Sequence, residues 1–194
     1  MVLLWRRFDI MRNLKFARCY LSGPMQFAKD SGIAWRKRFI VQTEHLGLEI
    51  MDPTNKPIPC TSEIGNEKET MEYLRDHERW EELKIFVKKF RREDLRFCDL
   101  ADFLVVAIDP SIHTMGTLDE VYTAERQKKP ILCIIEGGKK KLPFWGFAVF
   151  RTNEIFESVE ECIEYLNGID NGSIPMDDRW VLVGKYLKEA WNED

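Results

Sequence analysis

Short apolar runs alternate along this chain with longer stretches of mixed polarity. Residues 103–108 and 130–135 are continuous apolar runs of strand length, typical of parallel strands covered on both faces. Residues 16–21, which lead into Ser22, Gly23 and Pro24, and residues 48–51 predict two more strands. Residues 147–150 are the candidate for a fifth strand.

Helical periodicity fills the segments between these runs. Apolar residues three and four positions apart predict a helix through Trp35, Phe39 and Ile40 that ends near residues 45–47, and a long amphipathic helix over 68–98. Further helices are expected over 117–124, over 158–166 with Ser158 as N-cap, and within the C-terminal segment 175–194, over 180–191. Residues 52–67 contain three prolines and predict a loop or lid.

Strands that alternate with helices define the expected fold class. The sequence predicts a single α/β domain over residues 1–194, a doubly wound, mostly parallel five-stranded sheet with helices on both faces, flavodoxin-like or Rossmann-like. Ligands of such sheets bind beyond the carboxyl ends of the strands. The loops after residues 21, 108 and 135 are therefore the places to look for a site.

Composition and charge narrow the classes of partner. The chain is 44% hydrophobic and 32% charged, which is typical of a packed globular protein, and its net charge of −4 argues against binding a nucleic acid polymer. No apolar stretch approaches the roughly 20 residues that span a bilayer, and residues 1–13 lack a signal-sequence pattern, so we expect a cytoplasmic protein without a membrane partner. Five cysteines without a CxxC pair indicate reduced thiols, and three histidines without i, i+4 spacing give no support for a metal site.

The loop after the strand at 103–108 carries the main candidate for chemistry. It runs from Asp109 to Glu120, and Gly116 and Thr117 allow a tight entry into a helix with Glu120 in its first turn. That carboxylate is either aimed at a ligand or simply stabilised by the helix dipole. Cleavage of a glycosidic bond needs a pair of groups of this kind, one to attack the anomeric carbon and one to protonate the leaving group.

Several other residues could join Glu120. Asp94, Asp99 and Asp102 lie before the same strand, and Tyr20 and Ser22 at the end of the first strand could supply hydroxyl groups to a carboxylate or a sugar. At the start of the first helix, Lys29, Ser31, Arg36 and Lys37 form either a phosphate subsite or a solvated basic face.

Three stretches taken together resemble the nucleoside 2-deoxyribosyltransferase family and its N-glycohydrolase relatives. They read YLSGPM at 20–25, REDLRFCDLADFLVVAID at 92–109 and GTLDEVYTAERQKKPI at 116–131, and the match covers residues 16–150 in order. The resemblance implies that Glu120 is the nucleophile, that Tyr20 orients it, and that Asp94 contacts the base and helps to protonate it. Where the transferases commonly have an acidic residue, this chain has His113 and Thr114, so the sugar contact differs.

The same resemblance implies the remaining contacts and partners. Backbone-approach positions fall at Gly23 and Gly116, and the segment 142–149 resembles one that the family uses at an active site built between subunits. The substrate contacts that we expect from these motifs are Ser22, Gly23, Met25, Asp109, Gly116 and Thr117, with Trp145 either stacking on a base or lying at a subunit interface. We expect no cofactor, a nucleoside or nucleotide and a free base as ligands, and a homo-oligomer.

The expected function is cleavage of the N-glycosidic bond of a (2′-deoxy)nucleoside or nucleotide by Glu120, with transfer to another base. Two alternatives stay open at this point. One is a deoxynucleoside 5′-monophosphate N-glycohydrolase, and the other is a module that senses nucleotides without cleaving them.

Overall fold

Five strands form one parallel sheet at the centre of the computed structural model, which describes residues 12–26, 28–56 and 64–191, with side chains over 69–187 in the last range. The strand order is β2-β1-β3-β4-β5, and every neighbouring pair is parallel. The strands are β1 (Arg18–Ser22), β2 (Glu49–Met51), β3 (Phe103–Ile108), β4 (Ile131–Ile135) and β5 (Ile155–Phe156). The predicted doubly wound α/β fold is confirmed.

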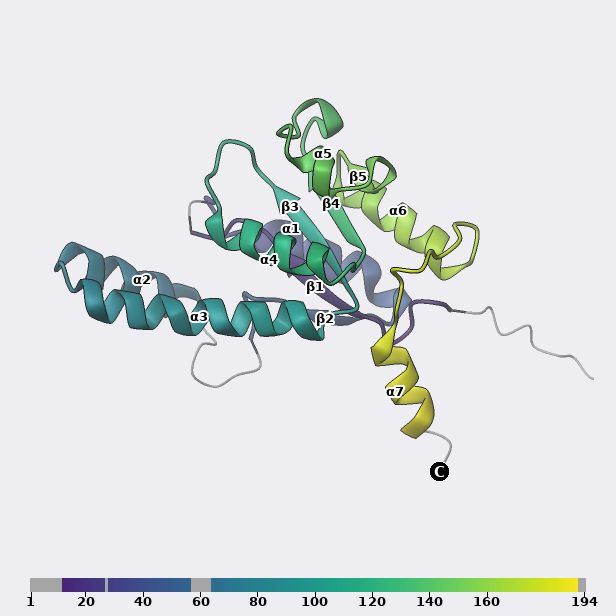
Figure 1. The fold of residues 1–194 in the computed structure, drawn as a ribbon, viewed down its shortest axis with the longest axis horizontal. Coiled ribbons are helices and arrows are strands. Elements are labelled where there is room, and N and C mark those ends of the chain that lie inside the picture. The colour runs from purple at the N-terminus through teal and green to yellow at the C-terminus, as the bar shows by residue number, and fades with distance from the viewer. Residues whose placement is uncertain (1–11, 27, 57–63, 192–194) are drawn as a thin grey trace, which may run out of the picture.

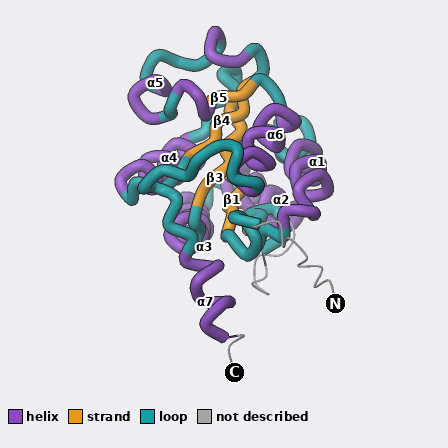
Figure 2. Tube along the Cα trace, turned by 90° about the vertical axis from the view of Figure 1, so that its right-hand side faces the viewer, coloured by secondary structure: helices purple, strands orange, loops and turns teal. Residues whose placement is uncertain are grey.

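Helices cover both faces of this sheet (Figures 1 and 2). Helices α1 (Ile33–Thr43) and α6 (Val159–Asp170) pack on the face that contains Cys19 and Leu21. Helices α3 (Trp80–Leu100) and α4 (Met115–Arg126) pack on the opposite face, which contains Tyr20. Since successive side chains of a strand point to opposite faces, Ser22 lies on the same side as Tyr20, toward α4.

The predicted helix over 68–98 is wrong in one respect, because it is two helices. α2 (Ile64–Asp76) and α3 are joined by a turn in which Glu78 has a left-handed backbone with φ 54°. No glycine or proline marks this break in the sequence, and the turn is closed instead by backbone hydrogen bonds such as Arg79 N–H to Leu74 O at 2.8 Å. The two helices form a hairpin that projects away from the sheet (Figure 1).

The start of α2 also shortens the predicted loop or lid at 52–67. Residues 52–56 form a turn after β2, residues 57–63 lie outside the described part of the chain, and residues 64–67 are already helical.

The strand predicted at 147–150 is wrong. Residues Gly146–Val149 form the one-turn helix α5, and the fifth strand is β5 at Ile155–Phe156, which is too short to show an alternating pattern. Short 3-10 helices η1 (Glu44–Leu46), η2 (Gly138–Lys140) and η3 (Thr152–Glu154) complete the connections.

The C-terminal helix α7 (Val183–Trp191) begins three residues later than the predicted 180, and residues 192–194 of the predicted segment are not described. The buried carboxylate of Asp102 fixes its start, because it accepts hydrogen bonds from Val183 N–H at 3.0 Å and Gly184 N–H at 3.2 Å. Asp102 also accepts Arg18 N–H at 2.8 Å, so it joins α7 to β1. It therefore serves the fold rather than the candidate chemistry.

The cysteines that the structure describes are free thiols inside the core, as their spacing predicted: Cys19, Cys98, Cys133 and Cys162. Cys60 lies outside the described residues. Across the described ranges, the structure contains no helix with the length and apolar character needed to cross a membrane.

Candidate active site

The two central strands β1 and β3 end side by side at the point where the chain reverses its winding. The connection from β1 runs through α1 to β2 on one side, whereas the connection from β2 returns through α2 and α3 to β3 on the other. Such a switch point is where open α/β sheets bind ligands. Tyr20 pairs with Leu104 and Ser22 with Val106, so both hydroxyl groups lie at this edge.

The carboxylate of Glu120 on α4 is held by two hydroxyl groups from β1. Tyr20 Oη donates to Oε1 at 3.1 Å, and Ser22 Oγ donates to Oε2. The Cys98 thiol of α3 donates to the backbone oxygen of Glu120 at 3.3 Å, which ties the two helices together at this residue. The structure therefore brings Glu120, Tyr20 and Ser22 together as one buried group.

The expected position of Glu120 in the first helical turn is wrong. Helix α4 begins at Met115 rather than 117, its first turn contains no acidic residue, and Glu120 falls in the second turn. Because the helix-dipole effect is confined to the first turn, it does not stabilise the charge of this carboxylate. The hydrogen bonds from Tyr20 and Ser22 of β1 stabilise it instead.

Burial sets the electrostatics of Glu120. Glu120 is 8% exposed, and the loss of solvation raises its pKa to about 7, with a smaller contribution from the negative charge of Asp94. The hydrogen bonds from Ser22 and Tyr20 and the positive charge of Arg36 lower it again. The pKa of Tyr20 is raised well above its usual value by burial and by Glu120, so the phenol stays protonated and remains a donor.

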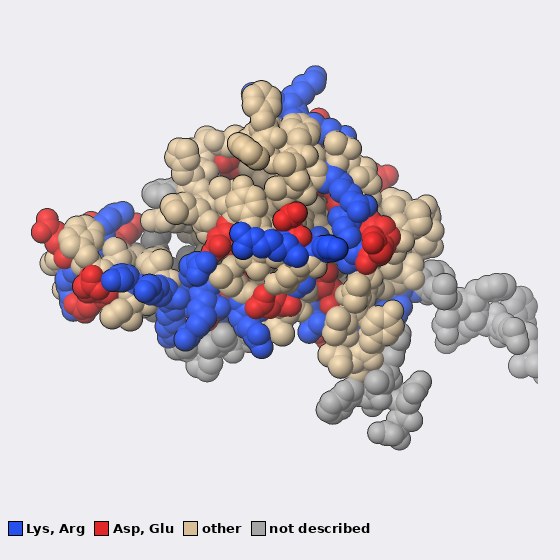
Figure 3. Space-filling view, in the orientation of Figure 1, with Lys and Arg blue, Asp and Glu red and all other residues tan. Residues whose placement is uncertain are grey.

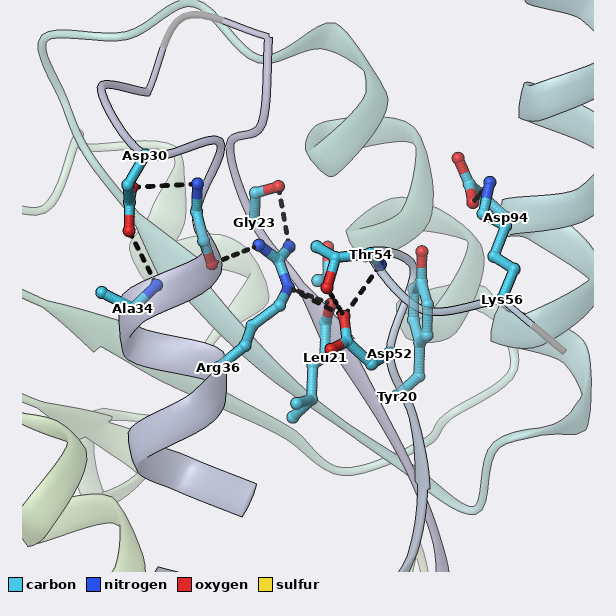
Figure 4. A network of polar contacts seen from close by, with 12 residues as sticks. Tyr20, Leu21, Gly23, Asp30, Ala34, Arg36, Asp52, Thr54, Lys56 and Asp94 are labelled. Atoms are coloured by element: carbon cyan, nitrogen blue, oxygen red, sulfur yellow. Dashed lines mark hydrogen bonds and ion pairs between the residues drawn. The ribbon is translucent and has the colours of Figure 1, made fainter. Parts of the chain in front are cut away.

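Asp94 on α3 lies near this group and forms an ion pair with a buried lysine. Its Oδ1 is 2.9 Å from Nζ of Lys56, whose side chain has no exposed surface (Figure 4). Burial raises the pKa of Asp94, and the positive charge of Lys56 opposes that shift. Asp94 and Glu120 thus lie on two neighbouring helices, α3 and α4.

Arg36 forms the other buried cation at this edge (Figure 4). Its guanidinium donates to the backbone oxygens of Leu21 at 3.3 Å, Gly32 at 2.8 Å and Gly23 at 3.1 Å. Asp52 after β2 lies 3.7 Å from its Nε. Because Arg36 is buried and these contacts occupy it, it supports the loops after β1 and β2 and belongs neither to a phosphate subsite nor to a solvated basic face.

Gly23 lies in a tightly packed position of the loop after β1. An added Cβ would lie 3.2 Å from both the backbone oxygen of Ala107 and the ring of Trp35, so a larger residue would push the loop away from β3. Gly116 is different, because an added Cβ there would meet no described atom within 4 Å. The space beside Gly116 is therefore open within the described part of the chain, and the substrate approach expected there stays a prediction.

The other predicted contact residues are not joined to the Glu120 side chain by a hydrogen bond between described residues. Asp109 is exposed and accepts from the backbone and hydroxyl of Ser111, and Met25 is half-buried in the loop after β1. Thr117 is buried in the first turn of α4. Trp145 is 80% exposed just before α5.

Sequence reasoning missed Lys56, and neither of the two alternatives that it left open for Arg36 included burial. A signal existed for Arg36, because it lies three residues before Phe39 and seven before Thr43, both of which face the core. Lys56 had no signal, since it lies in an irregular segment whose periodicity says nothing about burial.

The described residues contain no group of three or more His, Cys, Asp or Glu side chains arranged to hold a metal ion. The fold and site together define an α/β protein with strand order 2-1-3-4-5 and a buried carboxylate, that of Glu120, at the switch point of its parallel sheet. No family model matches the chain. A search of curated proteins likewise gives no match.

Proposed function

We propose that this protein cleaves the N-glycosidic bond of a (2′-deoxy)nucleoside or nucleotide, with Glu120 as the nucleophile, and transfers the sugar to another base. The observation that carries the proposal is the carboxylate of Glu120, held at the switch point by Tyr20 and Ser22. A carboxylate whose pKa is about 7 is available both protonated and ionised near neutrality. The ordered likeness of the chain to the deoxyribosyltransferase family assigns the same residues to this chemistry.

In this mechanism the ionised Glu120 attacks C1′ of the sugar, and the bond from C1′ to the base nitrogen breaks with its electron pair going to the base. Tyr20 and Ser22 fix the direction of attack because each occupies one oxygen of the carboxylate. Asp94 contacts the departing base, whose leaving nitrogen takes up the proton that Glu120 loses when it ionises for the attack. A second base or water then releases the sugar, with net retention of configuration.

A substrate screen with matched variants tests this proposal. The protein is incubated with deoxynucleosides and deoxynucleoside 5′-monophosphates, with and without an acceptor base, and the products are separated by chromatography. Base exchange identifies a transferase, and free base with free sugar identifies a hydrolase.

The Glu120→Gln variant should lose activity by several orders of magnitude, whereas Glu125→Gln on the exposed side of the same helix should not. Equal turnover by wild type and Glu120→Gln would contradict the nucleophile. Binding of nucleotides, seen as a thermal shift, without any released base would instead favour a sensing module.

We further propose that the protein acts as a homo-oligomer. Large apolar side chains are exposed on and beside α4 and α5, with Met115 at 87%, Phe144 at 94% and Trp145 at 80%. In Figure 3 the surface above α4 is mostly uncharged, whereas Lys, Arg, Asp and Glu mix over α3. An apolar surface of this kind is typical of an interface.

A further inference from the structure

The ammonium group of Lys56 is the most deeply buried charge beside the candidate site. Its side chain has no exposed surface, and the ring centroid of Phe90 lies 4.9 Å from Nζ. Asp94 is its only ion-pair partner among the described residues, with Oδ1 at 2.9 Å. Burying an ammonium is costly unless it is paired, so this lysine is held in place by Asp94.

The two oxygens of Asp94 have different surroundings. Oδ1 has almost no exposed surface and faces Lys56, while the Asp94 side chain as a whole keeps 18% exposure. Figure 4 shows the pair beside Tyr20, on the opposite side from Arg36. Oδ2 is therefore the oxygen left for a ligand at the switch point.

Charged and titratable groups face Asp94 from every element packed around it. They are Lys56 from the turn after β2, Glu93 and Cys98 from α3, Arg36 from α1, Tyr20 from β1 and Glu120 from α4. Among them Lys56 is the cation in direct contact with the carboxylate. Of these charged groups, Lys56 has the largest effect on the pKa of Asp94, because an interaction between buried charges is weakly screened.

We propose that Lys56 is a positioning residue that keeps Asp94 ionised and turns its free oxygen toward the substrate base. This role rests on the proposed function. An ionised Asp94 is an acceptor only, so it selects a base that presents an N–H group to it. Its negative charge also adds to the effect of burial in raising the pKa of Glu120.

A titration that needs no substrate tests the first half of this role. The side-chain carboxyl of Asp94 is followed by carbon NMR as a function of pH in wild type, in Lys56→Met, and in Lys88→Met, an exposed lysine on the same helix as Asp94. In Lys56→Met the midpoint of Asp94 should move to higher pH, because burial remains and the positive charge is gone. Lys88→Met should leave it in place.

An unmoved midpoint in Lys56→Met would overturn the proposal. If that variant does not fold, Lys56→Gln carries the same prediction, since its amide is polar but has no charge.

A kinetic cycle tests the second half. Lys56→Met should lower kcat on the order of tenfold, about the value of one hydrogen bond from the base to a charged carboxylate. In an Asp94→Asn background the same change should have no further effect, because Lys56 acts through Asp94. Equal losses in both backgrounds would show a general structural role and overturn the proposal. If wild type cleaves no nucleoside or nucleotide, the proposed function fails, while the titration still decides the role of Lys56.

Discussion

Glu120 is kept in an environment that opposes its charge. Burial raises its pKa to about 7 from a usual value of 4.5. The unfolded chain therefore releases this proton at lower pH than the folded protein does, and folding becomes less favourable as pH rises between these two values.

Replacing Glu120 by Gln should remove this penalty. At pH 8 the variant should be more stable than wild type by up to about 3 kcal/mol, since the pKa of Glu120 is raised from 4.5 to about 7 and each unit is worth about 1.4 kcal/mol. At pH 4 the Glu120 carboxyl is mostly protonated in both the folded and the unfolded protein, so the difference in stability should largely vanish. Urea unfolding at the two pH values measures it, and Glu125→Gln is the exposed control. A difference that does not change with pH would contradict the assignment.

The hydroxyl groups of Tyr20 and Ser22 should determine the pH above which Glu120 is ionised and active. Both hydrogen bonds lower the pKa of Glu120, so Tyr20→Phe or Ser22→Ala should move the acid limb of kcat/KM to higher pH. At pH 7 each variant should lose roughly tenfold in rate, as expected for one hydrogen bond to a charged group. The pH–rate profile of the proposed cleavage measures both effects. Variants that lower the rate equally at every pH would show that the hydroxyls do not act on this ionisation.

At the scale of elements, Arg36 joins the two loops that frame the switch point. Its guanidinium satisfies backbone oxygens at both ends of the loop after β1 and pairs with Asp52 after β2. Asp52 in turn accepts from the backbone and hydroxyl of Thr54. The position of the loop that contains Gly23 thus depends on a side chain from α1.

Arg36→Met should destabilise the protein by about 3 kcal/mol, because it leaves buried oxygens and a carboxylate without their partner. Arg38→Met is the matched control on the same helix, where an ion pair with Glu160 is half exposed and should contribute less than about 1 kcal/mol. Urea denaturation of both variants makes the comparison. Equal effects would show that Arg36 is not the tie between the loops.

At the scale of the whole molecule, the apolar side chains around α5 remain without a partner in the single chain. Phe144 and Trp145 precede α5 and Phe147 lies within it, and all three are exposed. Phe147 also belongs to the apolar run at 147–150 that predicted a strand. That prediction failed because a short apolar run is expected in a strand and equally at an interface.

The double variant Phe144→Ser, Trp145→Ser should convert the proposed oligomer into monomers without loss of helical content. Light scattering after size-exclusion chromatography measures the mass, and circular dichroism measures the fold. Val41→Ser, at another exposed apolar position on α1, serves as the control and should leave the mass unchanged. A wild-type protein that is monomeric at micromolar concentration would contradict the oligomer.

The sequence by itself determined the fold class and the first four strands, because a buried strand and an amphipathic helix impose different periods on neighbouring residues. It also singled out Glu120, Tyr20 and Asp94. Only the tertiary structure decided how these residues are held. Ser22 bonds Glu120, and Lys56 pairs with Asp94 across 38 positions of the chain. Burial and pairing between distant elements leave no local pattern, so the charges that set the behaviour of Glu120 become visible only once the chain is folded.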